Sequence, residues 1–270
     1  MLAQSLPPDI ELAAALSKAA KSLPERHLGL VQAAELASLP DILDELAGLL
    51  DESGYTQLPR PVAFACSNAP APDRLLNRYR VAVARDAAFS FLYRANLDCL
   101  TAMGAELAFF SPLADEPVPP ADGLYLPGGY PELHAGRLAG NSRWSSSMRS
   151  FADTKRPVLA ECGGMMVLFD RLIALDGTAD RMAGLLPGEV IMAEHLAAIG
   201  LQSLLSPEGE LRGHTFHYSR LETPLHPIGR CVPHLYGAGE YVYRHGAIVA
   251  SYLHAYFPSN PRAAAGLLRP

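Results

Sequence analysis

The stretch Pro157-Val-Leu-Ala-Glu-Cys-Gly-Gly-Met-Met-Val-Leu-Phe169 decides how this chain folds. The apolar residues 157–160 predict a buried parallel strand that stops at residues 161–162, and the glycine pair that follows predicts the start of a helix. A cysteine at such a turn projects above the edge of the sheet, where backbone N–H groups and the helix dipole favour a thiolate and a neighbouring oxyanion. The same strand–turn–helix arrangement holds the nucleophile of triad hydrolases. Cys162 is therefore a candidate nucleophile, and the alternative is a buried structural cysteine.

A second apolar strand is predicted near the C-terminus, and it ends at a histidine. This segment is Gly246-Ala-Ile-Val-Ala-Ser-Tyr-Leu-His-Ala-Tyr-Phe257. A thiol nucleophile needs a base that takes its proton, and histidine titrates near neutral pH. Open α/β folds gather their site residues at the carboxyl ends of the strands. We interpret His254 as the base for Cys162, with an ordinary packed histidine as the alternative.

A glycine turn follows a third predicted strand, in Gly123-Leu-Tyr-Leu-Pro-Gly-Gly-Tyr-Pro-Glu132. Glycines let the backbone approach a ligand and aim N–H groups at it, as an oxyanion hole requires. Gly128 and Gly129, together with Gly163, are the candidate donors. A Pro-Gly-Gly turn alone is a weak signal. The order strand–Gly-Gly, strand–Cys and strand–His is far more specific as a set.

Strands and helices alternate through the middle of the chain, and further strands follow. This order predicts an α/β fold, with a mostly parallel sheet flanked by helices on both faces and an added β section. Before it, apolar residues at helical spacing predict a helix over residues 36–50, and a shorter helical pattern covers residues 10–20. A linker rich in Pro and Ala, residues 58–72, precedes the main domain. The expected strands are 81–84, 106–110, 124–126, 185–192, 211–221, 240–244 and 247–253, and the expected helices are 90–103, 131–139 and 141–154.

The motifs resemble those of a known enzyme family. Leu126-Pro-Gly-Gly, Glu161-Cys-Gly-Gly and Tyr252-Leu-His look like the class I (triad-type) glutamine amidotransferases, whose fold is flavodoxin-like. More narrowly, the chain resembles the C-terminal amidotransferase domain of cobyrinic or hydrogenobyrinic acid a,c-diamide synthases. The narrower resemblance also rests on Arg212-Gly-His-Thr-Phe-His-Tyr-Ser219, Ala84-Arg-Asp-Ala-Ala-Phe89 and Pro24-Glu-Arg-His-Leu-Gly-Leu30.

The resemblance implies a reaction and its partners. A Cys–His dyad of Cys162 and His254 would hydrolyse glutamine and supply ammonia for the ATP-dependent amidation of two corrin-ring carboxylates. Glutamine, a corrinoid polycarboxylate and an ATP-binding domain are the expected partners. The chain has no Gly-x-x-x-x-Gly-Lys-Ser/Thr phosphate loop, so ATP and Mg²⁺ are expected on a missing N-terminal domain and no cofactor in this chain. Residues 1–57 are then a leader and helical remnant of that domain, and residues 58–270 the amidotransferase domain.

Three motifs depart from the pattern of the family. Thr215 stands where glutamate is expected in Gly-His-x-Phe-His-Tyr-Ser, Gly200-Leu-Gln replaces Gly-Tyr-Arg, and Tyr256 replaces the second histidine of Leu-His-x-His-Phe. These changes concern the acceptor side more than glutamine hydrolysis. Tyr256 also occupies the position at which many class I enzymes carry a glutamate that orients the histidine, so a dyad is expected rather than a triad.

Further residues of these motifs are candidates for binding. Tyr130 is expected to contact glutamine or the acceptor, or else to cap the following helix. Asp86 and Phe89 follow the first strand of the main domain, so they are acceptor-side candidates at the same sheet edge. His214 and His217 lie on opposite faces if their segment is a strand, so no shared metal is expected. They are acceptor-side candidates at the mouth of the Cys162 site.

Composition limits the class of protein. The 270 residues are 49% hydrophobic, enough for a sizeable core, and no apolar run approaches the roughly 20 residues of a membrane span. A net charge of −6 without a basic cluster argues against nucleic-acid binding. Cys66, Cys99, Cys162 and Cys231 have no metal-binding spacing, which indicates a reduced, cytoplasmic protein.

Two other functions stay open at this point. One is a non-catalytic corrinoid-binding or partner-docking module of the same fold, and the other is a cysteine hydrolase of another class. Retention of Cys162, the Gly-Gly turn and His254 favours the amidotransferase over the first. The motifs outside the catalytic residues favour it over the second.

Overall fold

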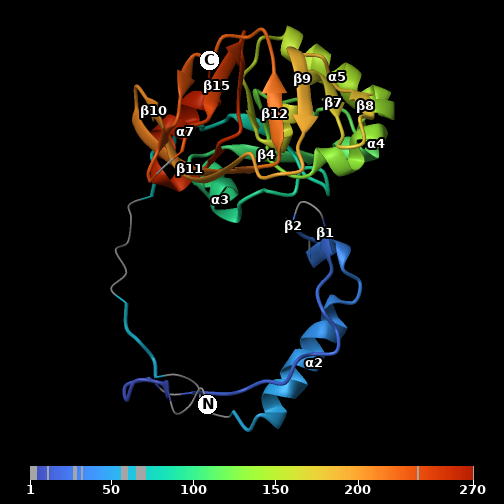
Figure 1. The fold of residues 1–270 in the computed structure, drawn as a ribbon. Coiled ribbons are helices and arrows are strands. Elements are labelled where there is room, and N and C mark those ends of the chain that lie inside the picture. Colours follow the sequence, from blue (N-terminus) through green and yellow to red (C-terminus); the bar gives the residue numbers. More distant parts are fainter. Residues whose placement is uncertain are drawn as a thin grey trace. The chain divides into compact units, whose positions relative to one another are not determined.

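The chain forms two compact units, Met1–Asn68 and Ala69–Pro270, in a computed structural model (Figure 1). The structure describes residues 5–10, 12–26, 29–31, 33–55, 60–64, 71–235 and 237–269. Nearly all of the regular structure, and every candidate site residue, belongs to the second unit.

The first unit is built around one amphipathic helix, α2 (Leu39–Glu52). This confirms the helix expected over residues 36–50. It begins later than expected because Pro40, which has no N–H to donate, occupies its first turn. The unit also contains β1 (Glu25–Arg26), β2 (Gly29–Leu30) and the 3-10 turn η1 (Ala33–Glu35).

The helix predicted from the apolar spacing at residues 10–20 is wrong. The described part of that stretch, residues 10 and 12–20, has no helical structure. A segment this short gains too few hydrogen bonds to form a helix unless a buried face stabilises it. Its apolar residues Ile10, Leu12 and Leu16 stay 54%, 45% and 50% exposed, so that stabilisation is missing.

The second unit is organised by a seven-stranded sheet in the order β13-β15-β16-β6-β5-β3-β4. The strands from β16 to β4 run parallel, while β15 and β13 extend one edge in the antiparallel direction. The inner strands are buried along nearly their whole length, as parallel strands covered on both faces must be. Their bounds are β3 (Arg80–Ala84), β4 (Glu106–Phe110), β5 (Gly123–Leu126), β6 (Val158–Glu161), β13 (Gly229–Arg230), β15 (Tyr241–His245) and β16 (Ile248–Ser251).

Helices connect the parallel strands and cover the sheet. α3 and α7 pack into one core cluster with the side chains of Val81, Val83 and Tyr125 from the sheet. Among the described residues, no helix is both long and apolar enough to cross a membrane. The helical segments are α3 (Arg94–Ala102), η2 (Pro112–Ala114), η3 (Pro131–His134), α4 (Ala135–Gly140), α5 (Ser142–Asp153), α6 (Gly163–Met166), η4 (Phe257–Ser259) and α7 (Pro261–Leu267). The expected α/β fold is confirmed.

α3 begins later than the helix expected over residues 90–103. The N–H of Phe91 donates to the carbonyl of Gly128 at 3.0 Å, which draws the start of that segment into a bridge with the glycine turn. A backbone committed to a partner on another strand cannot also make helical hydrogen bonds. The tertiary contact therefore overrides the local helical pattern.

The added β section consists of two four-stranded sheets, β12-β9-β7-β8 and β14-β10-β11-β17. The sequence predicted the strands around 185–192 and 211–221, but not β7, β8, β10, β14 or β17. The helix predicted to start at the glycine pair after Cys162 is the short α6, which ends at Met166 before β7 begins. The bounds are β7 (Phe169–Ile173), β8 (Ala179–Arg181), β9 (Leu186–Met192), β10 (Ala198–Ser206), β11 (Gly209–His217), β12 (Ser219–Glu222), β14 (Val232–Pro233) and β17 (His254–Ala255).

Replacing Gly164 with alanine should destabilise the second unit. The new Cβ would overlap the main-chain carbonyl of Leu126, which belongs to the sheet and cannot move aside easily. We expect a loss of about 1–3 kcal/mol in the free energy of unfolding, measured by urea denaturation. The matched control is Gly140→Ala, where nothing lies within 4 Å of the added Cβ. An unchanged midpoint for Gly164→Ala would show that the turn is packed less closely than this.

Candidate active site

Cys162 occupies a strained turn between β6 and α6. Its φ of 45° and ψ of −112° lie outside the regions that a residue with a Cβ normally adopts. Glu161 pairs with Ser251 across β6 and β16, and the N–H of Cys162 donates to Ser251 O at 2.8 Å. The pairing of the two strands thus holds the turn in place. Strain of this kind persists only where the surrounding structure enforces it, and it is common at functional sites.

His254 lies at the same edge of the sheet, shortly after the end of β16. Its strand, β17, leaves the main sheet and pairs with β11, with His254 opposite His214. The imidazole is 1% exposed, and a Cβ on Gly128 would overlap its Cε1 atom. Gly128 must therefore be glycine for the imidazole to fit. The structure thus brings the predicted residues Gly128 and His254 into contact.

The Gly-Gly turn also packs against the residue that follows the cysteine. A Cβ built on Gly163 would lie 2.9 Å from the nitrogen of Gly129. The carbonyl of Gly128 points toward Phe91, whose N–H it accepts. Because C=O and N–H point in opposite directions across a trans peptide bond, the N–H of Gly129 points away from Phe91. Gly129 and Gly163, two of the candidate oxyanion donors, therefore lie side by side, and Gly163 directly follows Cys162.

Burial controls the protonation of both Cys162 and His254. Burial, and then the nearby Glu132 carboxylate, raise the pKa of the Cys162 thiol far above its usual range, although the N–H of Gly163 lowers it. Burial also lowers the pKa of His254 to about 3, with smaller contributions from two neighbouring histidines. Both groups are neutral at neutral pH. The thiolate expected at a helix N-terminus is wrong for this closed site, because α6 is a single turn and desolvation outweighs its dipole.

β11 carries two histidines to opposite sides, as their spacing predicted. The ring of His214 stacks on His254, with centroids 5.0 Å apart and planes 14° apart. The hydroxyl of Tyr93 lies 3.3 Å from Nε2 of His214. His217 instead stacks on Tyr252, with centroids 3.7 Å apart. Among the described residues, no group of three or more His, Cys, Asp or Glu side chains is placed to hold a metal ion.

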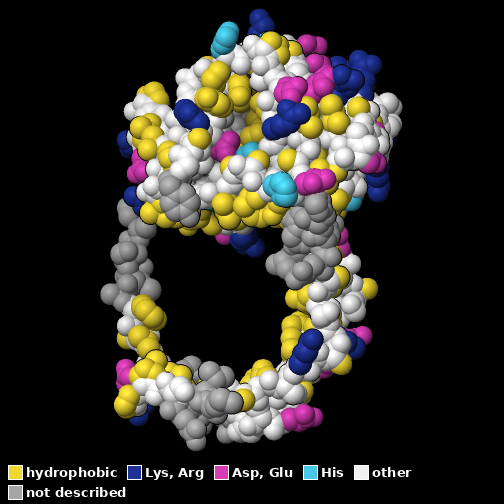
Figure 2. Space-filling view, viewed as in Figure 1, with side chains coloured by type: hydrophobic (Ala, Val, Ile, Leu, Met, Phe, Trp, Pro, Cys, Tyr) yellow, Lys and Arg dark blue, Asp and Glu magenta, His cyan; other side chains and the backbone are white. Residues whose placement is uncertain are grey.

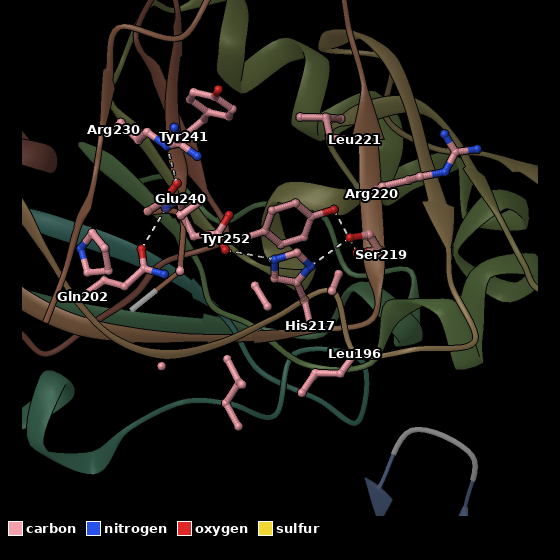
Figure 3. A pocket seen from close by; sticks show the side chains of 18 of the residues that line it. Leu196, Gln202, His217, Ser219, Arg220, Leu221, Arg230, Glu240, Tyr241 and Tyr252 are labelled. Atoms are coloured by element: carbon pink, nitrogen blue, oxygen red, sulfur yellow. Dashed lines mark hydrogen bonds and ion pairs between the residues drawn. The ribbon is translucent and has the colours of Figure 1, made fainter. Parts of the chain in front are cut away.

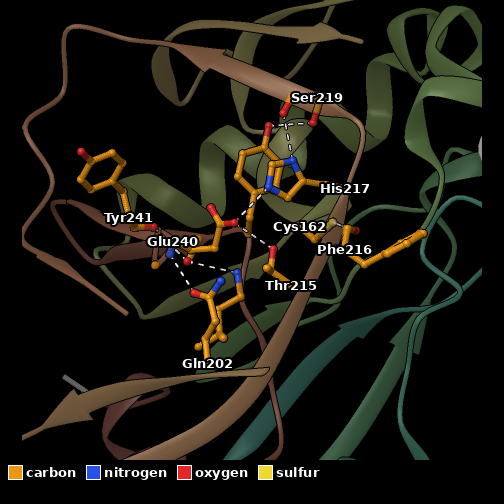
Figure 4. A network of polar contacts seen from close by, with 12 residues as sticks. Cys162, Gln202, Thr215, Phe216, His217, Ser219, Glu240 and Tyr241 are labelled. Atoms are coloured by element: carbon orange, nitrogen blue, oxygen red, sulfur yellow. Dashed lines mark hydrogen bonds and ion pairs between the residues drawn. The ribbon is translucent and has the colours of Figure 1, made fainter. Parts of the chain in front are cut away.

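Glu240 joins the site, although no motif marked it. Its Oε1 accepts from Thr215 Oγ1 at 2.9 Å and lies 3.1 Å from Nε2 of His217 (Figure 4). Its N–H donates to Oε1 of Gln202 at 2.8 Å. The carboxylate also contributes to the raised pKa of Cys162. The only signal in the sequence was indirect: Thr215 and Gln202, two of the departures from the family pattern, both contact Glu240.

Two cavities flank β11. One, of about 520 Å³, is lined by Glu240, His217 and Tyr252, with Arg220 and Arg230 also in its wall (Figure 3). On the face seen in Figure 2, the second unit is hollowed between β15 and β12, with hydrophobic side chains around the hollow. The other cavity, of about 430 Å³, has mostly apolar walls and is lined by His254, His214, Phe91, Tyr93, Ile199, Leu201 and neighbouring residues of β11.

Cys162 itself lies against β11. Its Sγ is 4.0 Å from the carbonyl oxygen of Phe216 (Figure 4). The side chain of Cys162 is almost completely buried, at 4% exposure. A substrate must therefore displace part of this cover before it can reach the sulfur.

The remaining predicted residues make structural contacts. The Asp86 carboxylate accepts three hydrogen bonds of 2.9 Å from neighbouring loops. Phe89 is fully buried. The ring of Tyr130 packs edge-on against Phe91, with centroids 4.9 Å apart. An acceptor-side or glutamine-binding role for these residues stays a prediction.

Glu161 is a buried carboxyl group that ties β6 to β17. Its Oε2 accepts from Tyr125 Oη at 2.8 Å, and its Oε1 accepts from the N–H of Ala255 at 3.1 Å. Burial raises its pKa to about 8, against the opposing effect of these two hydrogen bonds. Near neutral pH it is mostly protonated. Glu161 therefore positions the residue next to His254 without adding a full negative charge beside Cys162.

Comparison with known proteins identifies the family of this chain. Residues 80–262 match the CobB/CobQ-like glutamine amidotransferase domain. The whole chain is 51% identical to the hydrogenobyrinate a,c-diamide synthase of Pseudomonas aeruginosa and covers 62% of it. Over 97% of its length, it is 48% identical to the cobyrinate a,c-diamide synthase of Herminiimonas arsenicoxydans and covers 61% of it. A solved structure described as a glutamine amidotransferase supports the fold, with a TM-score of 0.50 and 17% identity over 70% of this chain and 96% of that one.

The fold, the site and these matches define a glutamine amidotransferase. The chain belongs to the family of CobB/CobQ-like glutamine amidotransferase domains. This confirms the resemblance inferred from the motifs. It also excludes the alternative that the chain is a cysteine hydrolase of another class. The chain spans less than two thirds of the length of the two diamide synthases.

Glu161→Gln should make the stability of the second unit less dependent on pH. The folded state raises the pKa of Glu161 from 4.5 to about 8, so the folded protein binds more protons between these values. The stabilising contribution is full below the lower value and is lost as pH rises toward the upper one. Urea denaturation at about pH 5 and about pH 8.5 should show a steeper loss for the native protein than for the variant. Equal losses in both proteins would contradict the buried, protonated carboxyl.

Proposed function

We propose that this chain is the glutamine-hydrolysing portion of an ATP-dependent a,c-diamide synthase that acts on cobyrinic or hydrogenobyrinic acid. The observation that carries the proposal is the strained turn at Cys162, which packs through Gly163 and the Gly128–Gly129 turn against His254. The names of the two relatives supply the class of acceptor, a corrin-ring carboxylate. Their greater length supports a further portion, which we expect to bind ATP and Mg²⁺.

In the proposed reaction, His254 takes the proton of the Cys162 thiol and the sulfur attacks the side-chain amide carbon of glutamine. The N–H groups of Gly129 and Gly163 stabilise the oxyanion of the tetrahedral intermediate. His254 then protonates the leaving nitrogen, and ammonia departs from a glutamyl thioester. A water molecule, deprotonated by His254, attacks the thioester and releases glutamate with the free thiol. Glutamine and water thus yield glutamate and ammonia.

The closed state of the site supports slow hydrolysis by the chain alone. Proton transfer from Cys162 to His254 creates a thiolate and an imidazolium, and burial disfavours both charges. A glutamine molecule or a movement of the cover would have to lower this cost. Such a resting state suits an enzyme that releases ammonia only when the acceptor is ready.

The remaining part of the proposal concerns residues 1–57. We assign them to the end of an ATP-binding domain, and residues 58–270 to the amidotransferase domain. In α2, the leucines Leu43, Leu46 and Leu50 are 56%, 40% and 37% exposed. Apolar side chains at this helical spacing form a stripe that another domain would cover.

Cys162 should be the residue that reacts with an electrophilic glutamine analogue. Mass spectrometry after partial labelling should find the label on Cys162 and not on the buried Cys99 or Cys231, because Cys162 has the strained turn and the Gly129–Gly163 contact beside it that would bind the analogue. Cys66 lies outside the described residues, and we expect it to react slowly as well. Cys162→Ala should lose labelling and glutamate release by at least about 1000-fold, with its melting temperature nearly unchanged. Equal labelling of Cys162→Ala would remove this residue from the mechanism.

The chain alone should not amidate a corrin carboxylate, even with ammonia, ATP and Mg²⁺ in excess. Activation of a carboxylate by ATP requires a phosphate-binding loop with Mg²⁺, and the sequence has no Gly-x-x-x-x-Gly-Lys-Ser/Thr motif. Mass spectrometry of hydrogenobyrinic acid after incubation should show no gain of amide groups. The full-length Pseudomonas aeruginosa relative under the same conditions is the positive control. Amidation by the purified chain would show a nucleotide site of another kind.

A further inference from the structure

His254 lacks the partner that normally fixes the ring of a catalytic base. Its Nδ1 is buried and has no hydrogen-bond partner among the described residues. Tyr256, and not a carboxylate, stands two positions further along. A base that serves one sulfur atom must keep its ring in one orientation, because small misplacements of reacting groups cost large factors in rate. Another contact must therefore orient this imidazole.

The register of the β section places His214 against that ring. β11 pairs with β17 so that His214 and His254 are directly opposite, with their side chains on the same face of the sheet. Their rings are nearly parallel, 14° apart, with centroids 5.0 Å apart. The Tyr93 hydroxyl, 3.3 Å from Nε2 of His214, holds the outer ring from the other side.

Two further contacts close the space around the imidazole of His254. The main chain of Gly128 leaves no room for even one methyl group beside Cε1. The ring of Phe91 meets His254 edge-on, with centroids 5.8 Å apart. Of these neighbours, His214 is the one that covers the flat face of the ring. It is therefore the one that can prevent the imidazole from turning about its Cβ–Cγ bond.

We propose that His214 is a positioning residue for His254, and that its stacked ring performs the orienting role that a carboxylate performs in a catalytic triad. This inference rests on the proposed function, because it assigns His254 as the base. It replaces the acceptor-side role expected for His214 from the sequence. His214 is only half buried and lines the apolar cavity with His254, so a substitution there removes little core packing.

His214 also influences the charge of the base. After burial, His214 is the next largest cause of the lowered pKa of His254. Without that neighbour, the pKa of His254 should rise. Because the base must be neutral to accept the thiol proton, activity is lost as pH falls through this pKa, and the loss should then occur at higher pH. The other titratable groups that face or adjoin His254 are His217 on β11, Cys162 and Glu161 at the end of β6, and Tyr93 before α3.

The test compares His214→Ala and His214→Phe in the full chain. The alanine variant removes the stack, and we expect kcat for glutamine hydrolysis to fall about 10-fold or more, with KM changed less than about twofold. The phenylalanine variant keeps a flat ring on His254, and it should recover most of that loss. In both variants the acid limb of the kcat–pH profile should move to higher pH. His234→Ala is the matched control, since His234 is a partly exposed histidine that bonds to Ser203 and touches neither His254 nor Cys162.

The outcomes separate this inference from simple damage and from failure of the proposed function. Loss of kcat in both variants with an unmoved acid limb would mean that His214 does not act through His254, and would overturn the proposal. Native activity in both variants would overturn it as well. Activity retained by His254→Ala but lost in His214→Ala would reverse the roles of the two histidines.

If His214→Ala melts early, Tyr93→Phe, which removes only the hydroxyl that holds His214, should still lower kcat by about 2- to 5-fold. No glutamate release by the native chain, with Cys162 unlabelled, would refute the proposed function itself.

Discussion

The close approach of two glycine turns is the constraint on which the rest of the site depends. Gly163 packs on the Gly129 nitrogen, Gly164 packs on the carbonyl of Leu126, and Gly128 leaves room for His254. Each contact is too short for any side chain. The strained backbone at Cys162 can persist because these contacts and the pairing of β6 with β16 leave it no alternative. The proposed nucleophile, oxyanion donors and base are therefore positioned mainly by main-chain packing.

The same packing keeps Cys162 and His254 uncharged and therefore weakly reactive. Removal of water from Cys162 and His254 keeps both neutral, and the carboxylates near the sulfur oppose ionisation further. Glu161 adds little to this opposition at neutral pH, because it is itself mostly protonated there. The site thus combines precise placement with low intrinsic reactivity. Such a combination is expected where release of ammonia must wait for another event.

Local signals in the sequence predicted the sheet and its edge well. Apolar runs that end at Cys162, His254 and Gly128 each carry their own turn chemistry, so each could be interpreted without knowledge of the rest of the chain. Contacts that depend on distant strands could not be predicted. Glu240 meets Thr215 and His217 only because β10, β11 and the start of β15 come together. The neutral state of Cys162 was missed for a similar reason, since the cover over its sulfur comes from β11 and not from its own segment.

The position of β6 has a consequence for how the site is made in the cell. β6 lies in the middle of the sheet, yet one of its neighbours, β16, comes from near the end of the chain, as does the strand that carries His254. During synthesis the N-terminal part of the sheet can form while β6 still has an open edge. The strand that carries His254 can reach the end of the sheet at which Cys162 lies only after β16 and β17 have emerged and paired. A ribosome-bound chain that lacks those strands therefore holds Cys162 without His254, so the proposed dyad stays incomplete until β16 and β17 have been made.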